Sequence, residues 1–431
     1  MDYVKLLKIN PKGNRITFDY EVSPGLQKYF SADVQFTIEY FLEGHPVDEI
    51  EFVPHSICAI PFVCNVLPII WITNSRLIIP VLDREFWEGL PQIKQGYEAM
   101  FPESAFLGEV CPQTVVENKS PSAGAACFFS GGLDASQTLL AHLDENPHLL
   151  SIWGSDIKFC NKDGWEVVRN GLKKTADLFN VPLVEIRSSF REFDRESALD
   201  ADYSTQLQDS WWHGVKHGLG LLGHAAPYAF LKGLSSVYIA SSNCPLDGQI
   251  RCASHPSIDN HVRFCGCQIV HDGYHFSRQD KVQNIVDYCT KTQKYFSLHV
   301  CWESQAGGNC CYCEKCYRTM VAIIASGSDP VLFGFEKAYE ALPKMRDNLL
   351  ISNKISPFLA STQWIHIQNK LISQQQQLKR SPFWNSVKWL LTVDCFDIRS
   401  YSLPLGYRIR QKLSQYHFYQ KLHELKVKLR G

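Results

Sequence analysis

The first 118 residues show the alternation of apolar and polar positions that is typical of strands with one buried face. Apolar side chains at Ile16, Phe18 and Tyr20 are separated by Thr17 and Asp19. A helix is expected after the last of these strands, over 84–100. The sequence therefore predicts a β-rich N-terminal domain over 1–118, and the strands expected in it are 16–22, 34–40, 69–73 and 77–82.

The pattern changes after the segment 118–124, Asn-Lys-Ser-Pro-Ser-Ala-Gly, whose composition suits a linker. Short apolar runs then alternate with segments of helical periodicity. This alternation predicts an α/β domain over 119–330, with a mostly parallel sheet and helices on both faces. The expected strands are 125–129, 149–153, 181–186 and 237–241, and the expected helices are 135–144 and 164–179.

Residues 331–431 predict a helical, basic C-terminal region. From Lys370 to the end there are twelve Lys or Arg residues and three acids. Aromatic side chains beside basic ones can stack on bases and hold phosphates, but an amphipathic helix with aromatics facing a core gives the same pattern. The interleaved residues are Tyr401, Tyr407, Arg408, Arg410, Lys412, Tyr416, Phe418, Tyr419 and Lys421.

Composition limits the class of protein. A chain of 431 residues suggests two or three domains, and its formal net charge of −1 restricts any nucleic-acid contact to a local patch. The apolar stretch 57–72 contains Pro61 and Pro68 and is shorter than a membrane helix requires, so we expect it in the core. We see no signal peptide at the N-terminus.

The segment 130–136 predicts an anion-binding loop. It reads Ser-Gly-Gly-Leu-Asp-Ala-Ser and stands between an expected strand and an expected helix. Two glycines allow close approach to an anion, and the N–H groups of a helix N-terminus favour negative charge. Candidate nucleotide-binding residues are Ser130, Gly131, Gly132, Leu133, Asp134 and Ser136, with Asp134 either holding Mg²⁺ or bracing the loop. An ordinary turn that caps a helix is the alternative.

A second cluster predicts a metal site. The chain has sixteen cysteines, and five of them fall within 301–316. Four have the spacing C-x8-C-x2-C-x2-C, which suits a closed, structural Zn²⁺ site, with an iron–sulfur cluster as the alternative. Cys311 has no expected role. Such clustering favours a reducing compartment, so we expect a cytoplasmic protein. The predicted ligands are Cys301, Cys310, Cys313 and Cys316.

The 130–136 loop resembles the SGGxDS signature of the N-type ATP pyrophosphatases, the PP-loop family, with Ala135 in place of the last serine. This loop, followed about 170 residues later by the cysteine pattern and Arg318, resembles the 7-cyano-7-deazaguanine synthase family over 125–326. The resemblance implies an ATP- and Mg²⁺-dependent ligase that adenylates a 7-deazaguanine carboxylate or amide, releases diphosphate, and then forms an amide or nitrile.

The same resemblance suggests roles for further residues. Lys281 and Arg318, with Asp134, are catalytic candidates that neutralise phosphate charge. Asp259, His255 and His213 are substrate-binding candidates, because a carboxylate can accept hydrogen bonds from the guanine-like edge. Surface charges, turn caps and structural histidines are the alternatives.

The chain is longer than the central portion that the resemblance covers. Long proteins of this kind are associated with bacterial antiviral islands, including type IV CBASS systems. We therefore expect the base to be conjugated to an amine of a partner protein. Synthesis of the free nitrile, modification of tRNA or DNA, and a non-catalytic nucleotide-binding scaffold remain alternatives.

Overall fold

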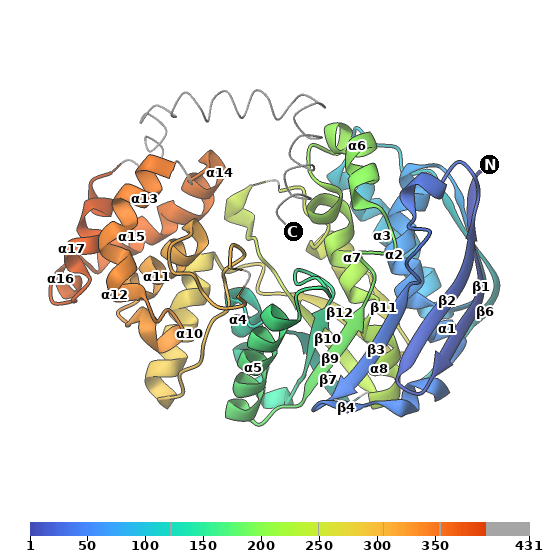
Figure 1. Ribbon diagram of the computed structural model, residues 1–431, viewed down its shortest axis with the longest axis horizontal. Coiled ribbons are helices and arrows are strands. Elements are labelled where there is room, and N and C mark those ends of the chain that lie inside the picture. The colour runs from blue at the N-terminus through green and yellow to red at the C-terminus, as the bar shows by residue number, and fades with distance from the viewer. Residues whose placement is uncertain (121–122, 249, 305, 353–354, 394–431) are drawn as a thin grey trace.

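The computed structural model describes residues 1–431 apart from 121–122, 249, 305, 353–354 and 394–431. The described chain forms a large lobe built on a β-sheet and a smaller helical lobe beside it (Figure 1). The predicted basic and aromatic positions beyond residue 393 lie outside the described residues.

Within this part of the chain, twelve strands form one mixed sheet in the order β11-β12-β10-β7-β8-β9-β3-β2-β1-β5-β6, with β4 paired to β3. The strands are β1 (Tyr3–Lys12), β2 (Arg15–Val22), β3 (Thr37–Leu42), β4 (His45–Pro46), β5 (Arg76–Asp83), β6 (Glu109–Val116), β7 (Gly124–Phe128), β8 (His148–Trp153), β9 (Leu183–Ser188), β10 (Leu234–Ala240), β11 (Arg263–Phe264) and β12 (Cys267–Asp272).

The helices are α1 (His55–Cys58), α2 (Ile60–Ile72), α3 (Arg84–Met100), α4 (Leu133–Ala141), α5 (Lys162–Phe179), α6 (Glu196–Leu207), α7 (His217–Leu222), α8 (Ala225–Lys232), α9 (Pro256–Asp259), α10 (Arg278–Thr292), α11 (Glu314–Ala325), α12 (Ala338–Ala341), α13 (Met345–Ser352), α14 (Pro357–Leu359), α15 (Ile365–Ser373), α16 (Gln375–Leu378) and α17 (Trp384–Val387). The predicted α/β class is therefore confirmed.

The strands β12, β10, β7, β8 and β9 are parallel, and the central ones, such as β7 and β9, are buried on both faces. In β7, Ala126 and Phe128 pack toward α2, α3, α7 and α8, whereas Ala125 and Cys127 pack toward α4 and α5. Burial on both faces explains why these strands read as short apolar runs without alternation. The carboxyl ends of these parallel strands meet at one edge of the sheet.

The N-terminal strands continue the same sheet. Strand β3 pairs antiparallel with β9, with Tyr40 opposite Ile186. One hydrophobic core includes Phe18 and Phe62 from the N-terminal region together with Phe190 and Leu219 from the central one. The sheet and the core thus continue across the boundary expected near residue 118.

The strand predicted over 69–73 is wrong. These residues belong mostly to α2, which is buried on all sides. An apolar run without periodicity fits a buried helix as well as a buried strand, and the chain around Pro68 remains helical. The helical stretch His55–Ile72 is long and apolar enough to cross a membrane, but 89% of it is buried inside this structure. It is a core helix here.

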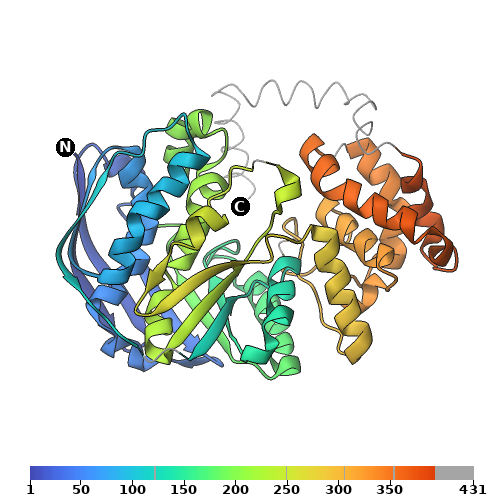
Figure 2. The same ribbon diagram turned by 180° about the vertical axis from the view of Figure 1, so that it is seen from behind.

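The helices from α10 onward form the second lobe around their own core. Its buried side chains include Tyr317 and Met320 of α11, Trp364, and Leu371 of α15. Figure 2 shows this lobe from behind, with α10 on the side that faces the sheet lobe. Leu133, the first residue of α4, packs into the same core. The 130–136 loop therefore lies where the two lobes meet.

Candidate functional site

The 130–136 loop joins the carboxyl end of β7 to the start of α4. Gly131 has a φ of 72°, a left-handed conformation that favours glycine, and a Cβ there would lie 3.2 Å from Leu172 Cδ2. The Gly132 N–H donates to Ser130 Oγ at 3.3 Å. The N–H groups of the first helical turn have no acceptor within the helix, so the loop and the helix terminus together suit an anion.

The two serines of the loop have different surroundings. Ser130 is exposed, whereas Ser136 is fully buried and its Oγ has no hydrogen-bond partner among the described residues. Ser130 is therefore the serine whose hydroxyl is open to solvent.

Asp134 forms ion pairs with two residues of α10. Its carboxylate lies 3.2 Å from Arg278 Nη1 and 3.4 Å from Lys281 Nζ. Lys281 also donates to the backbone oxygen of Ser241, just after β10. Burial raises the pKa of Asp134, but the charges of Lys281, Arg278 and Lys315 outweigh burial and hold it below its usual value. Asp134 therefore braces the loop against α10.

Helix α11 adds two more cations. Arg318 Nε lies 3.3 Å from Glu314 Oε1, and both side chains are only 6% exposed. Burial and the nearby charge of Arg278 lower the pKa of Arg318 to about 10. Burial and Arg278 also lower the pKa of Lys315.

We call Arg278, Lys281, Lys315 and Arg318 the basic cluster. Among its described neighbours, Asp134 and Glu314 are the carboxylates that pair with it directly, and Asp156 is a more exposed acid within electrostatic range of Lys315. Counting direct ion pairs, four cations against two carboxylates leave an excess of positive charge beside the loop, and the Cys313 sulfur is a further negative group within electrostatic range of Arg318. Because buried charge is costly without a partner, this excess favours an anionic ligand.

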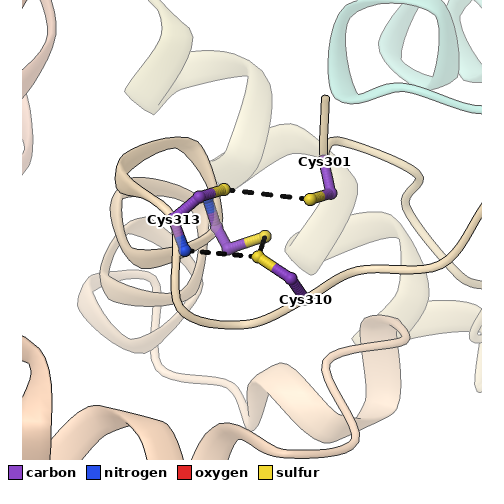
Figure 3. A group of neighbouring side chains, drawn as sticks. Cys301, Cys310 and Cys313 are labelled. Carbon is purple, nitrogen blue, oxygen red and sulfur yellow. Dashed lines mark hydrogen bonds between the residues drawn. The ribbon is translucent and has the colours of Figure 1, made fainter. Parts of the chain in front are cut away.

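Four cysteine sulfurs converge next to this cluster. The Sγ atoms of Cys301 and Cys313 are 3.9 Å apart, as are those of Cys310 and Cys316, and all four lie within 4.8 Å of one another. A tetrahedral site with metal–sulfur bonds of about 2.3 Å requires sulfurs about 3.8 Å apart. Figure 3 shows the side chains of Cys301, Cys310 and Cys313 pointing toward one another. The group could hold a metal ion such as zinc.

The local backbone supports this arrangement. The N–H groups of Tyr312 and Cys313 donate to Cys310 Sγ at 3.4 and 3.3 Å, and the Cys316 N–H donates to Cys313 Sγ at 3.4 Å. These hydrogen bonds favour thiolates, which are the metal-binding form. Cys311 is buried outside the four-sulfur group, and its Sγ contacts the Asn309 oxygen at 3.7 Å.

The cysteine group connects the loop to the basic cluster. Cys313 is the N-cap of α11, so the group lies at the start of the helix that carries Lys315 and Arg318. Two residues before Cys301, the His299 N–H donates to the Gly131 oxygen at 2.7 Å. A metal at the four sulfurs would thus hold both the helix and the loop in place.

The candidates Asp259 and His255 lie near the end of β12. Asp259 is fully buried, and its Oδ2 contacts His271 Nδ1 at 2.7 Å and Ser254 Oγ at 2.9 Å. Its Oδ1 has no partner among the described residues. His255 contacts the Tyr274 hydroxyl at 3.3 Å, and burial lowers its pKa.

This group stands at the same sheet edge as the loop. The residue after His271, Asp272, accepts a 2.7 Å hydrogen bond from Thr138 of α4. Strand β12 is separated from β7 by β10 alone, which at ~4.8 Å per strand corresponds to roughly 10 Å. Ligands of open α/β sheets bind at the carboxyl ends of parallel strands.

His213 lies in a different local setting. Its Nδ1 is 2.5 Å from Asp209 Oδ2, and its side chain is 52% exposed. It also hydrogen-bonds to Cys252, which stands two residues before Ser254.

Comparison of the chain with models of known protein families, with curated proteins and with solved structures found no match. The site must therefore be interpreted from its own residues.

Sequence reasoning missed several members of the site. Arg278, Lys315, His271 and Cys252 were not among the predicted site residues. The spacing offered a signal, because residues three apart on a helix share a face, as do Arg278 with Lys281 and Lys315 with Arg318. No comparable signal exists for His271 or Cys252, since their partners are distant in sequence.

Proposed function

We propose that this protein adenylates a carboxylate with ATP, using the 130–136 loop and the basic cluster to hold the phosphates. The observation that supports this most directly is the excess of buried positive charge beside a glycine-containing loop at a helix N-terminus. Phosphoryl and adenylyl transfer require positioning and charge neutralisation more than covalent chemistry from the protein.

In this reaction a carboxylate oxygen attacks the α-phosphorus of ATP. The bond from that phosphorus to the bridging oxygen breaks, and diphosphate leaves with the electron pair. Lys281 and Arg278 are held toward the loop by Asp134, and Lys315 and Arg318 approach from α11. Mg²⁺, when bound with ATP, would supply further positive charge through the phosphate oxygens.

The resemblance of the loop and the cysteine pattern to 7-cyano-7-deazaguanine synthases suggests a 7-deazaguanine carboxylate as the substrate. Asp259 supports this, because its Oδ1 lacks a partner among the described residues and could accept from the N–H groups of a guanine-like edge. The group around Asp259 and His255 stands at the same sheet edge as the loop, where the carboxylate of a bound base could reach ATP.

The second half of the proposed reaction forms an amide. We propose that the amine belongs to a partner protein in an antiviral system, since the chain extends well beyond the part that resembles the synthases. With ammonia as the amine the product would be the free amide or nitrile. Mass spectrometry of the reaction with and without added proteins distinguishes these products.

The test is release of diphosphate from ATP by the purified protein, with and without 7-carboxy-7-deazaguanine. We expect release that depends on the base, with AMP formed in equal amount. In Lys281→Ala the rate should fall at least about 100-fold, because a buried cation that neutralises the phosphates is lost. Lys291→Ala, on an exposed position of the same helix, is the matched control and should keep the wild-type rate.

Three outcomes would contradict the proposal. Absence of diphosphate release with the base would reject this substrate. Release that is equal in wild type and Lys281→Ala would reject the assigned site. Release that depends instead on added RNA or DNA, and weakens steeply with salt, would favour a nucleic-acid-modifying enzyme.

We propose zinc as the metal at the four cysteines, with an iron–sulfur cluster as the alternative. Elemental analysis of the protein should give one zinc per chain and no iron, with no absorbance near 400 nm. Iron and acid-labile sulfide in the anaerobically purified protein would reverse the assignment.

A further inference from the structure

A cysteine, a histidine and an aspartate form a connected group away from the metal site. Asp209 contacts His213 Nδ1 at 2.5 Å, and His213 forms a second side-chain hydrogen bond with Cys252. The Ala253 N–H donates to the His213 backbone oxygen at 3.3 Å, which ties the two segments together. This is the order of contacts in which a carboxylate orients an imidazole that activates a thiol nucleophile.

A second histidine strengthens the group. His217 also hydrogen-bonds to Cys252, while its own Nδ1 has no partner among the described residues. The start of α7 packs closely on this segment, because a Cβ on Gly218 would lie 2.4 Å from the Ala253 oxygen. This close packing of α7 on the Cys252 segment holds His213 and His217 near the cysteine.

The charges around Cys252 favour its thiolate. Cys252 is 4% exposed, and this burial raises its pKa, but the hydrogen bonds from His213 and His217 outweigh burial and lower its pKa to about 6. The contacts with Asp209 and Cys252 raise the pKa of His213 to about 10. At neutral pH the pair therefore exists as thiolate and imidazolium.

The other nearby ionisable groups do not cancel this effect. The buried hydroxyl of Tyr97 faces the same region, and burial raises its pKa well above the usual value, so it stays neutral. Arg251, the residue before Cys252, is paired with Glu103 at 2.8 Å and donates to the Leu207 oxygen.

The group adjoins the proposed substrate site. Two residues after Cys252, Ser254 donates to Asp259, which contacts His271 near the carboxyl end of β12. The group of Cys252, His213 and Asp209 reaches solvent through His213, whose side chain is 52% exposed. Through Ser254, the segment that carries Cys252 therefore connects to the group assigned to the base.

We propose that Cys252 is a catalytic nucleophile that takes the acyl group from the adenylate and passes it to the acceptor amine as a thioester. This inference rests on the proposed adenylation. The thiolate sulfur attacks the acyl carbon, a C–S bond forms, the C–O bond to AMP breaks, and AMP leaves with the electron pair. The amine nitrogen then attacks the same carbon, the C–S bond breaks, and the amine loses a proton as the thiolate is restored.

His213 and Asp209 are positioning residues in this proposal. Asp209 orients the imidazole through Nδ1 and stabilises its positive charge, which leaves the other ring nitrogen to interact with the sulfur in this proposal. The imidazolium keeps the thiol ionised, and it can stabilise charge that develops when the adenylate is attacked.

The first test follows the thiolate by its absorbance near 240 nm between pH 4 and pH 9. The difference between wild type and Cys252→Ser should titrate with a midpoint near 6. In His213→Asn the midpoint should rise by at least one pH unit, which a merely structural role would not produce. Cys244→Ser is the control, because burial raises the pKa of Cys244 and its removal should leave the curve unchanged below pH 8. A Cys252 midpoint above 8 would overturn the proposal.

The second test looks for the thioester. Intact-mass spectrometry of wild type, mixed with ATP and 7-carboxy-7-deazaguanine but no acceptor, should show one acyl adduct that neutral hydroxylamine removes. Cys252→Ser should lack this labile adduct and form amide at least about 100-fold more slowly.

The outcomes separate the two proposals. If wild type releases diphosphate with the base, yet shows no adduct, and Cys252→Ser forms amide at the wild-type rate, the thioester is rejected and adenylation stands. If wild type releases no diphosphate while the Cys252 titration has a midpoint near 6, the proposed substrate fails and the activated thiolate stands without it.

Discussion

A single buried histidine should set part of the pH dependence of stability. His224 is fully buried, with Ser188 Oγ 2.7 Å from its Nε2 and the Gly220 oxygen 2.8 Å from its Nδ1. Burial lowers its pKa from 6.5 to about 4. The unfolded chain therefore binds a proton more readily than the folded one between these two pH values.

The sign of the effect follows from this difference. Above pH 6.5 the neutral His224 contributes its full stabilisation to the fold. As the pH falls from 6.5 to about 4, the free energy of unfolding decreases by a total of roughly 3 kcal/mol. Urea unfolding of wild type should show this loss. His224→Gln should be less stable at pH 7 and should lose less stability on acidification, whereas His45→Gln, at an exposed position, should follow wild type. Parallel pH curves for His224→Gln and wild type would contradict this prediction.

At the scale of one element, the conformation of the 130–136 loop depends on Gly131. In Gly131→Ala the left-handed backbone should cost about 1–2 kcal/mol, and the new Cβ would press on Leu172 of α5. We expect a lower urea midpoint and a larger fall in base-dependent diphosphate release than stability alone explains, because the N–H groups that we propose bind the phosphates would shift.

A second glycine provides the control. Gly171 lies within α5, and a Cβ there would have no heavy atom within 4 Å. Gly171→Ala should therefore stabilise the protein by up to about 1 kcal/mol through helix propensity and leave diphosphate release unchanged. Equal behaviour of the two alanine variants would show that the loop does not need its left-handed residue.

At the same scale, the start of helix α11 should depend on a metal bound at the four cysteines. Removal of a bound metal by a chelator should leave four thiols that no longer hold the N-cap at Cys313. Hydrogen exchange should then accelerate in 299–325, including the segment that donates to the loop, and much less in β7 and β8. Protection that is unchanged after the metal is lost would mean that side-chain packing alone holds α11.

At the scale of the whole molecule, the N-terminal region and the centre should behave as one folding unit. Strand β3 supplies the neighbour of β9, and one core includes side chains from both regions. A fragment that begins at residue 119 would expose the edge of β9 and apolar residues such as Ile186 and Phe190. We expect it to be insoluble or to bind a hydrophobic dye, whereas the full chain should not. A soluble fragment with cooperative unfolding would contradict this.

The sequence by itself determined those features whose cause is local. Helix 84–100 was predicted with the bounds that α3 has, and the structure shows a local cause for its start, because the Asp83 side chain accepts from the Phe86 N–H. The strands at 77–82, 125–129 and 149–153 correspond to β5, β7 and β8 within a few residues. The four cysteines lie within sixteen positions of one another, so their sulfurs can converge through local chain geometry alone.

The tertiary structure alone decided which distant segments meet. Local pattern does not distinguish a buried helix from a buried strand, so α2 was predicted in part as a strand. No local signal indicated that β3 would pair with β9, or that Asp134 would contact α10, 144 residues away in the case of Arg278. Contacts such as Cys252 with His213 depend on how helices pack on the sheet, and a single sequence carries no direct record of that packing.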